Sequence, residues 1–348
     1  MNSGPQRILI RSTNWIGDVV MSLPAMREVR RLHPEAHLAV VARDWVADLY
    51  RGQGLADEII SFPASRSSLR LLRRIRGFDR AVLFQNAFEA ALLVSLAGIR
   101  DRVGYATQHR GVLLTRKARP RAPARRLHQV FYYLDLLYLT GLSSTDYLSC
   151  SDFTPDIRLR PTSGGLEQAR GILQQTGVGP GARLIGLNPG ATFGPAKRWL
   201  TDRYGELADR LIRESGATVL IFGSAAERPI AEKIRAAMRE ERPVILNGLT
   251  KLEALAALIS ECSLFITNDS GPMHLAAALQ VPQIALFGST DEIATGPFDT
   301  NAAVIHKHVE CSPCLRRTCP IDLRCFTRIT VDEVFEKAQG ILRSELES

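Results

Sequence analysis

Short apolar runs alternate with longer amphipathic segments along almost the whole chain. In the first half, apolar runs at 7–11, 37–42 and 80–85 predict strands, and helices are expected from about Asp18 and across 88–98. Buried parallel strands form near-continuous apolar runs, and helices connect them. The alternation therefore predicts an α/β fold with a doubly wound parallel sheet.

The second half repeats this pattern. Further strands are expected at 183–190, 218–223, 244–248, 263–269 and 283–288. Further helices are expected at 202–215 and 231–240. Between about 150 and 182 the pattern weakens and Gly and Pro accumulate, with one more helix expected at 166–175. A chain of 348 residues is longer than a domain with a single hydrophobic core usually is, so we expect two facing Rossmann-like domains. Ligands should bind in the cleft between them, at the carboxyl ends of the strands.

Charge is spread unevenly over this pattern. The chain carries a net charge of +8, and arginines concentrate in 66–80 and 110–126. Such runs attract polyanions, which could be nucleic acid, an anionic membrane face or a phosphorylated substrate, although a solvated basic face is the simpler alternative. Few aromatic residues interrupt the runs, which argues against a platform for stacking single-stranded bases.

Targeting signals are not evident in the sequence. No apolar run approaches the ~18 residues of a membrane-spanning helix, and the N-terminus has no apolar core of a signal peptide. We therefore expect a cytoplasmic protein.

Four of the six cysteines lie close together, at Cys311, Cys314, Cys319 and Cys325. Disulfides are disfavoured in the cytoplasm, and the spacing lacks the long central loop of a zinc ribbon. Reduced structural thiols are the expectation, and a thiolate-bound metal is the alternative.

Common phosphate-binding signatures are missing. The first predicted strand–helix turn contains one glycine, Gly17, and therefore lacks G-x-G-x-x-G; no Walker A pattern and no D-x-D occur anywhere. A dinucleotide cofactor is not expected. We expect no cofactor at all.

Three loops of the second half carry residues suited to a nucleotide diphosphate. Each follows a predicted strand: 191–199 supplies cations, 223–229 supplies a carboxylate for ribose hydroxyls, and 268–274 opens a helix whose amides and dipole favour an anion. Capping of that helix by Asp269 or Ser270 and a packed histidine at 274 are the ordinary alternatives. The candidate donor-binding residues are Thr192, Lys197, Glu227, Asp269, Ser270, Gly271 and His274.

The segments NWIGDVVMSLPAMREVRRLHP, NPGATFGPAKRW and FITNDSGPMHLAAALQVPQIALFGST resemble the bacterial lipopolysaccharide heptosyltransferases of glycosyltransferase family 9. The resemblance runs over nearly the whole chain, and GPAKRW with residues 84–105 is most similar to the heptosyltransferase II branch. It implies a GT-B fold: an acceptor domain at 1–160, a linker at 161–182, a nucleotide-sugar domain at 183–328 and a C-terminal helix at 329–348 returning to the first domain.

The resemblance also implies an activity. We expect metal-independent, inverting transfer of L-glycero-D-manno-heptose from ADP-heptose to a heptosyl-Kdo-lipid A acceptor, by a protein peripherally bound to the cytoplasmic face of the inner membrane and without a nucleic-acid partner. There are three alternatives. The protein could be a heptosyltransferase of type I or III, or another GT-B nucleotide-sugar enzyme such as an epimerase. It could also be an arginine-rich nucleic-acid-binding protein with a four-cysteine metal site.

Catalytic roles follow from the residues and the resemblance together. Asp18 is the candidate general base, with an N-cap aspartate as the alternative, and Lys197 would meet the charge of the departing ADP. The candidate acceptor-binding residues are Asn14, Trp15, Gly17, Asn86 and Arg110.

Overall fold

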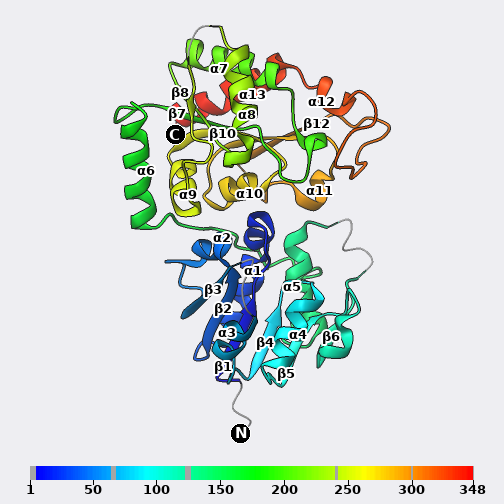
Figure 1. Cartoon of the computed structure of the whole chain (residues 1–348). Helices are drawn as coiled ribbons and strands as arrows, with labels where there is room; N and C mark the ends of the chain where they lie inside the picture. Colours follow the sequence, from blue (N-terminus) through cyan, green and yellow to red (C-terminus); the bar gives the residue numbers. More distant parts are fainter. Residues whose placement is uncertain (1–4, 64–67, 122–126, 240–241, 299–300, 348) are drawn as a thin grey trace. The chain divides into compact units, whose positions relative to one another are not determined.

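A computed structural model describes residues 5–63, 68–121, 127–239, 242–298 and 301–347. The chain divides into two compact units, Met1–Ile157 and Arg158–Ser348, and each unit is built on its own parallel sheet (Figure 1).

The sheet of the first unit has the strand order β3-β2-β1-β4-β5-β6, with every neighbouring pair parallel. Its strands are β1 (Arg7–Arg11), β2 (His37–Arg43), β3 (Glu58–Phe62), β4 (Arg80–Leu83), β5 (Asp101–Tyr105) and β6 (Arg116–Ala118). The order reverses between β1 and β4, where Ile8 pairs with Arg80. Ligands of doubly wound sheets bind at the carboxyl ends of the strands beside such a reversal.

Helices cover both faces of the first sheet. They are α1 (Ile16–Leu32), α2 (Asp44–Ala47), η1 (Asp48–Tyr50), α3 (Ser68–Arg74), α4 (Phe88–Leu96), η2 (Arg110–Leu113) and α5 (Gln129–Leu139). Helices α1 and α5 pack together, while α3 and α4 bury the sheet face that carries Leu9. Because both faces are covered, consecutive residues Ile8, Leu9 and Ile10 are all fully buried, as an apolar run in a parallel strand predicts.

The second sheet has the order β12-β11-β10-β7-β8-β9 and is also parallel throughout. Its strands are β7 (Leu184–Asn188), β8 (Thr218–Ile221), β9 (Val244–Ile245), β10 (Cys262–Asn268), β11 (Gln283–Phe287) and β12 (Ala302–His306). Counted along each unit, the two sheets share one strand order, and the second reverses between β7 and β10. The predicted pair of doubly wound α/β units is confirmed.

The second unit contains more helices than the first in the part of the chain described. They are α6 (Ser163–Gln175), η4 (Pro195–Lys197), α7 (Thr201–Ser215), η5 (Ala225–Glu227), α8 (Arg228–Ala237), α9 (Leu252–Ser260), α10 (Gly271–Ala278), α11 (Glu292–Thr295), α12 (Arg324–Thr327) and α13 (Val331–Glu347). Helix α6 begins with a cap in which Thr162 Oγ1 accepts from the Gly165 amide at 3.0 Å, and it packs on α9. The segment expected to be a linker, 161–182, thus contributes a packed helix to the second unit.

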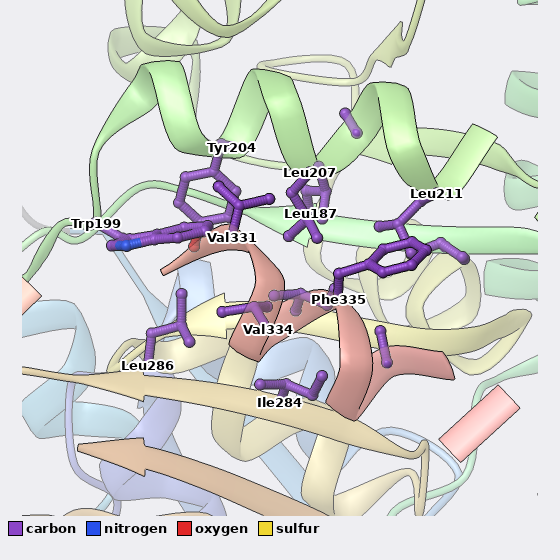
Figure 2. Close-up of a cluster of buried hydrophobic side chains, with 14 of the residues drawn as sticks. Leu187, Trp199, Tyr204, Leu207, Leu211, Ile284, Leu286, Val331, Val334 and Phe335 are labelled. Atoms are coloured by element: carbon purple, nitrogen blue, oxygen red, sulfur yellow. The ribbon is translucent and has the colours of Figure 1, made fainter. Parts of the chain in front are cut away.

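The last helix corrects a prediction. Residues 329–348 were expected to return to the first domain, but α13 packs on α7, β10 and β11 of the second unit. Figure 2 shows Val334 and Phe335 between Leu207 on one side and Ile284 on the other. Apolar side chains at helical spacing give α13 a stripe that completes the core of its own unit.

No helix within the described ranges is both long and apolar enough to cross a membrane.

Candidate active site

Asp18 lies in the first turn of α1, directly after the β1 loop at the strand-order reversal of the first sheet. Trp15 is the N-cap of this helix and its side chain makes no capping bond, so the N-cap alternative for Asp18 does not hold. Gly17 is buried, Asp18 is partly buried, and the Trp15 side chain is exposed. A carboxylate in the first helical turn is favoured by the helix dipole.

Tyr133 of α5 holds the Asp18 carboxylate. Its phenolic hydroxyl donates to Asp18 Oδ1 at 3.1 Å. Burial and the neighbouring negative charge of Asp18 raise the pKa of Tyr133 well above its usual value, so the phenol stays protonated and remains a donor. Tyr133 could not be predicted as a partner of Asp18 from the sequence, because 115 residues separate the two.

Asn86 follows β4 on the other side of the same reversal. Its Nδ2 donates to the Tyr132 hydroxyl at 2.7 Å, and its Oδ1 accepts from Arg110 Nη2 at 2.9 Å. Adjacent tyrosines of α5 therefore support Asn86 and Asp18.

Arg110 does not fit the acceptor-binding role predicted for it. The residue is fully buried, and Nε donates to the Tyr105 carbonyl at 2.8 Å while Nη1 donates to the Gln85 carbonyl. Burial lowers its pKa to about 10. Because its guanidinium is directed at protein acceptors, Arg110 positions Asn86 and has no exposed surface for an acceptor.

Asn14 is fixed in the turn between β1 and α1. Its Oδ1 accepts from Arg11 Nη2 at 3.1 Å, and its carbonyl accepts from Trp45 Nε1 at 2.8 Å. Arg11 is itself buried, and desolvation lowers its pKa to about 10. These bonds order the turn that presents Trp15.

In the second unit, Lys197 and Asp269 form an ion pair, with 2.5 Å between Nζ and Oδ2. Both side chains are largely buried, and Thr290 Oγ1 donates to the same Asp269 oxygen at 2.6 Å. The Lys197 ammonium also lies 5.0 Å from the centre of the Phe193 ring. Asp269 thus holds together the loops that follow β7, β10 and β11.

Ser270 is the N-cap of α10, but its side chain does not cap the helix. Its Oγ accepts instead from Asn188 Nδ2 at 2.9 Å, and the same amide donates to Thr267 Oγ1 at 3.1 Å. Asn188 ends β7, so this contact joins β7 and β10 at the reversal of the second sheet. Gly271 and the buried His274 lie in the first turn of α10.

Glu227 lies after β8 and closes a capping box: Oε2 accepts from the Ser224 amide at 2.9 Å and from its hydroxyl at 2.8 Å. Its other oxygen packs against Gly190, where an added Cβ would stand 2.2 Å from Oε1. A side chain at position 190 would therefore displace the Glu227 carboxylate from its place beside the loop after β7. Thr192, in that same loop, is exposed.

Asn268, at the end of β10, supports the loops of this cluster and was not among the residues predicted from the sequence. Fully buried, it accepts through Oδ1 from the Trp199 amide at 3.1 Å and the Tyr204 hydroxyl at 3.2 Å, and donates to the Pro189 carbonyl at 2.7 Å. A signal was present in the sequence, since the apolar runs of β7 and β10 both end in asparagine.

The basic runs of the first unit are partly structural. Arg121 is paired with both Asp135 and Asp146, and Arg80 pairs with Asp101 at 2.8 Å. Arg119 is exposed. Arg125 and Arg126 lie outside the described residues.

The cysteines are all free thiols. Cys325 is buried in the second core, and its burial raises the pKa of the thiol, while Cys311 is exposed. Between them, the Arg317 carbonyl accepts from the Ala196 amide at 3.0 Å, so the cysteine-bearing segment supports the Lys197 loop.

Two doubly wound units with polar residues gathered at their strand-order reversals have the architecture of GT-B glycosyltransferases. A family model described as "Glycosyltransferase family 9 (heptosyltransferase)" matches residues 68–324, and the chain belongs to this family.

Relatives and solved structures agree with this assignment. The chain is 33% identical over 318 residues to "Lipopolysaccharide heptosyltransferase 2" of Escherichia coli, covering 86% of this chain and 87% of the relative. It is 31% identical over 311 residues to "Lipooligosaccharide heptosyltransferase 2" of Haemophilus influenzae, covering 86% and 88%. The structure of the E. coli ADP-heptose lps heptosyltransferase II superposes with a TM-score of 0.84 at 31% identity, covering 97% and 99% of the two chains.

Proposed function

We propose that this glycosyltransferase moves L-glycero-D-manno-heptose from ADP-heptose onto the heptosyl-Kdo-lipid A inner core of lipopolysaccharide, with inversion at the anomeric carbon. Relatives named heptosyltransferase 2, at 31% and 33% identity, support this step over the first or third transfer. The similarity to the E. coli ADP-heptose lps heptosyltransferase II supports ADP-heptose as the donor.

The observation that carries the proposal is the cluster at the β7–β10 reversal. A largely buried Lys197 ammonium, the uncapped first turn of α10 and Ser270 come together through the Asp269 ion pair and the Asn188 bonds. A cation beside a helix N-terminus is suited to a diphosphate.

Further donor contacts complete this picture. Glu227 would accept from the ribose hydroxyls, and His274, Gly271 and Thr192 would border the diphosphate and the sugar. In the course of the reaction, Lys197 and the α10 amides stabilise the negative charge that develops on ADP. This stabilisation supplies what a catalytic divalent cation would otherwise supply.

The first unit is proposed to bind the acceptor. Asp18 removes the proton from the attacking hydroxyl, and attack opposite the diphosphate inverts the configuration. Asn14, Trp15 and Asn86 border the acceptor sugar, while Arg110 acts through Asn86. Exposed basic residues such as Arg119 would face the anionic inner leaflet, which makes the protein a peripheral enzyme on the cytoplasmic side.

Calorimetric titration with ADP, UDP and GDP, paired with a transfer assay, tests the function. We expect ADP to bind most tightly, and ADP-heptose to be consumed only with a heptosyl-Kdo-lipid A acceptor. Transfer to an acceptor lacking the first heptose would indicate the earlier step of the pathway. Isomerisation of a nucleotide sugar without transfer would indicate an epimerase. Steeply salt-dependent nucleic-acid binding without nucleotide affinity would contradict both.

A further inference from the structure

Two histidines and a glutamate converge in the second unit, apart from every residue proposed to touch the donor. They are Glu292 at the start of α11, His306 at the end of β12 and His308 just beyond it (α11 and β12 in Figure 1). His306 Nδ1 lies 2.7 Å from Glu292 Oε2, and His308 Nε2 lies 3.5 Å from Glu292 Oε1. The three ligand atoms all lie within 4.8 Å of one another.

The hydrogen bonds of Ser312 determine which nitrogen of His306 carries a proton. The Ser312 hydroxyl donates its one hydrogen to the Gly288 carbonyl, which can only accept. Ser312 Oγ, 2.7 Å from His306 Nε2, must therefore accept from the ring. In neutral imidazole this leaves a lone pair on Nδ1, directed toward Glu292.

This lone pair has no suitable partner. The His306 side chain is only 3% exposed, and no group in the described ranges makes a hydrogen bond of acceptable geometry to Nδ1. The atom that faces it is a carboxylate oxygen, which is also an acceptor. Two acceptors at 2.7 Å, one on a buried side chain and one on a side chain that is 20% exposed, repel each other unless a proton or a cation lies between them.

We propose that a divalent borderline metal ion of the Zn²⁺ class binds to Glu292, His306 Nδ1 and His308 Nε2, with water as a fourth ligand. Imidazole and carboxylate ligands suit this class, and around a tetrahedral ion with ligand distances of ~2.0–2.1 Å the donors lie about 3.3 Å apart. His308 Nε2 already has about this spacing from Oε1, at 3.5 Å, whereas His306 Nδ1 lies 2.7 Å from the other oxygen, Oε2. The carboxylate must therefore turn, and the closer pair must open by about half an ångström, for one oxygen to bind the ion beside both nitrogens. His308, 73% exposed, gives the ion access from solvent.

The surroundings indicate a structural role. Histidines that bind a metal through one ring nitrogen usually donate a hydrogen bond from the other, which fixes their tautomer and orientation. Ser312 accepts such a bond from Nε2 of His306. Glu292 lies two residues after Thr290, whose hydroxyl binds Asp269. The ion would join this loop to β12 and so stiffen the segment that holds Asp269.

Titration of the metal-free full chain with Zn²⁺ and Co²⁺ tests the proposal. We expect one high-affinity site whose dissociation constant rises at least about tenfold in His308→Gln and in Glu292→Gln, and about tenfold in Ser312→Ala. His308 is exposed, so its variant should fold normally, as circular dichroism checks. His37→Gln is the matched control, because His37 and Glu58 form a similar pair, 3.5 Å apart, in the first unit; its affinity should equal that of the wild type.

The cysteines require a separate arm of the experiment. Co²⁺ bound by nitrogen and oxygen lacks the intense near-ultraviolet charge-transfer bands of thiolate ligation, and we expect none. Substitution of Cys311, Cys314 and Cys319 by serine should leave the site intact. Loss of binding in that variant, or unchanged affinity in His308→Gln and Glu292→Gln, would overturn the proposal in favour of a thiolate site. No binding at all would mean that His306 is a protonated partner of Glu292. None of these readouts depends on which sugar the enzyme transfers.

Discussion

Tyr133 and Asp18 are joined by a 3.1 Å hydrogen bond between a buried phenol and a carboxylate in the first turn of α1. The phenol cannot ionise in the ordinary pH range because burial and the carboxylate both raise its pKa. The bond therefore fixes the orientation of the Asp18 carboxylate, which is what a base needs before it meets a hydroxyl.

Asp18→Asn should abolish most transfer. The substitution removes the proton acceptor without changing its size, and a general base contributes about 10²–10⁴-fold to the rate. Steady-state kinetics should show this loss in kcat, with ADP affinity unchanged. Asp44→Asn is the control, since Asp44 occupies the first turn of α2 in the same unit and is exposed. If Asp18→Asn keeps more than about a third of the wild-type kcat, another group is the base.

Tyr133→Phe tests the positioning role of the phenol. We expect kcat to fall about tenfold, because the variant loses one hydrogen bond to a charged group. The KM for the donor should stay constant. Tyr138→Phe, on the same helix, keeps the ring that lies over Arg121 and should behave like the wild type. A fall in thermal stability with unchanged kcat would instead make Tyr133 a purely structural residue.

The sequence predicted the interior of each sheet better than its edges. The runs that became β1, β2, β7 and β10 are long and apolar because helices cover both faces. Strand β6, with the sequence RKA, has no apolar run at all, and only one residue of β12, Ile305, is buried. Edge strands lack a neighbour on one side, so their residues are less constrained and their signal is weak.

The candidate site was predictable where one loop carries the chemistry, and not where distant segments meet. Lys197 and Ser270 could be proposed from their own loops, because a strand-end cation and a helix start are local features. Tyr133, Asn188 and the burial of Arg110 depend on tertiary contacts across up to 115 residues. A run of basic residues predicts arginines exposed to solvent. Only the folded structure shows that the Arg110 guanidinium donates to three acceptors of the protein.

Lys197→Gln should weaken ADP binding and slow transfer together. A cation on the diphosphate acts in both the ground state and the transition state, and losing one charge-assisted contact costs about 1.5–3 kcal/mol. Calorimetry with ADP and steady-state kinetics measure the two effects. Unchanged ADP affinity would place Lys197 outside the donor site.

A control separates binding from stability for this variant. Removing Lys197 also takes the only opposite charge of this ion pair away from the buried Asp269 carboxylate, which keeps its hydrogen bond from Thr290, so the melting temperature should fall. Lys307→Gln breaks a more exposed lysine–glutamate pair in the same unit, 2.8 Å long, with Glu333. This control should leave the ADP affinity unchanged, and it should change the free energy of unfolding by no more than about 0.5 kcal/mol.

Arg121→Gln should lower the stability of the first unit and leave ADP binding unchanged. Arg121 holds two carboxylates, one of which, Asp135, is 1% exposed and would lose its partner. Removing one member of a buried pair costs about 3–5 kcal/mol, and we expect the lower end because Arg121 is partly exposed. Urea unfolding at neutral pH measures the loss. Arg119→Gln, an exposed neighbour, should cost less than about 0.5 kcal/mol and act only on acceptor KM at low salt.

The same variant should change how stability depends on pH. The hydrogen bonds from Arg121 hold the pKa of Asp146 below its usual value of 3.8. In the wild type, the stability that Asp146 contributes is therefore complete above pH 3.8 and is lost as the pH falls through the lowered value, because the unfolded chain then binds more protons. Arg121→Gln removes the largest cause of the shift, so its unfolding free energy should fall less steeply than that of the wild type below pH 3.8. Parallel acid-side slopes in the two proteins would mean that Arg121 does not stabilise the Asp146 carboxylate and acts on stability through Asp135 alone.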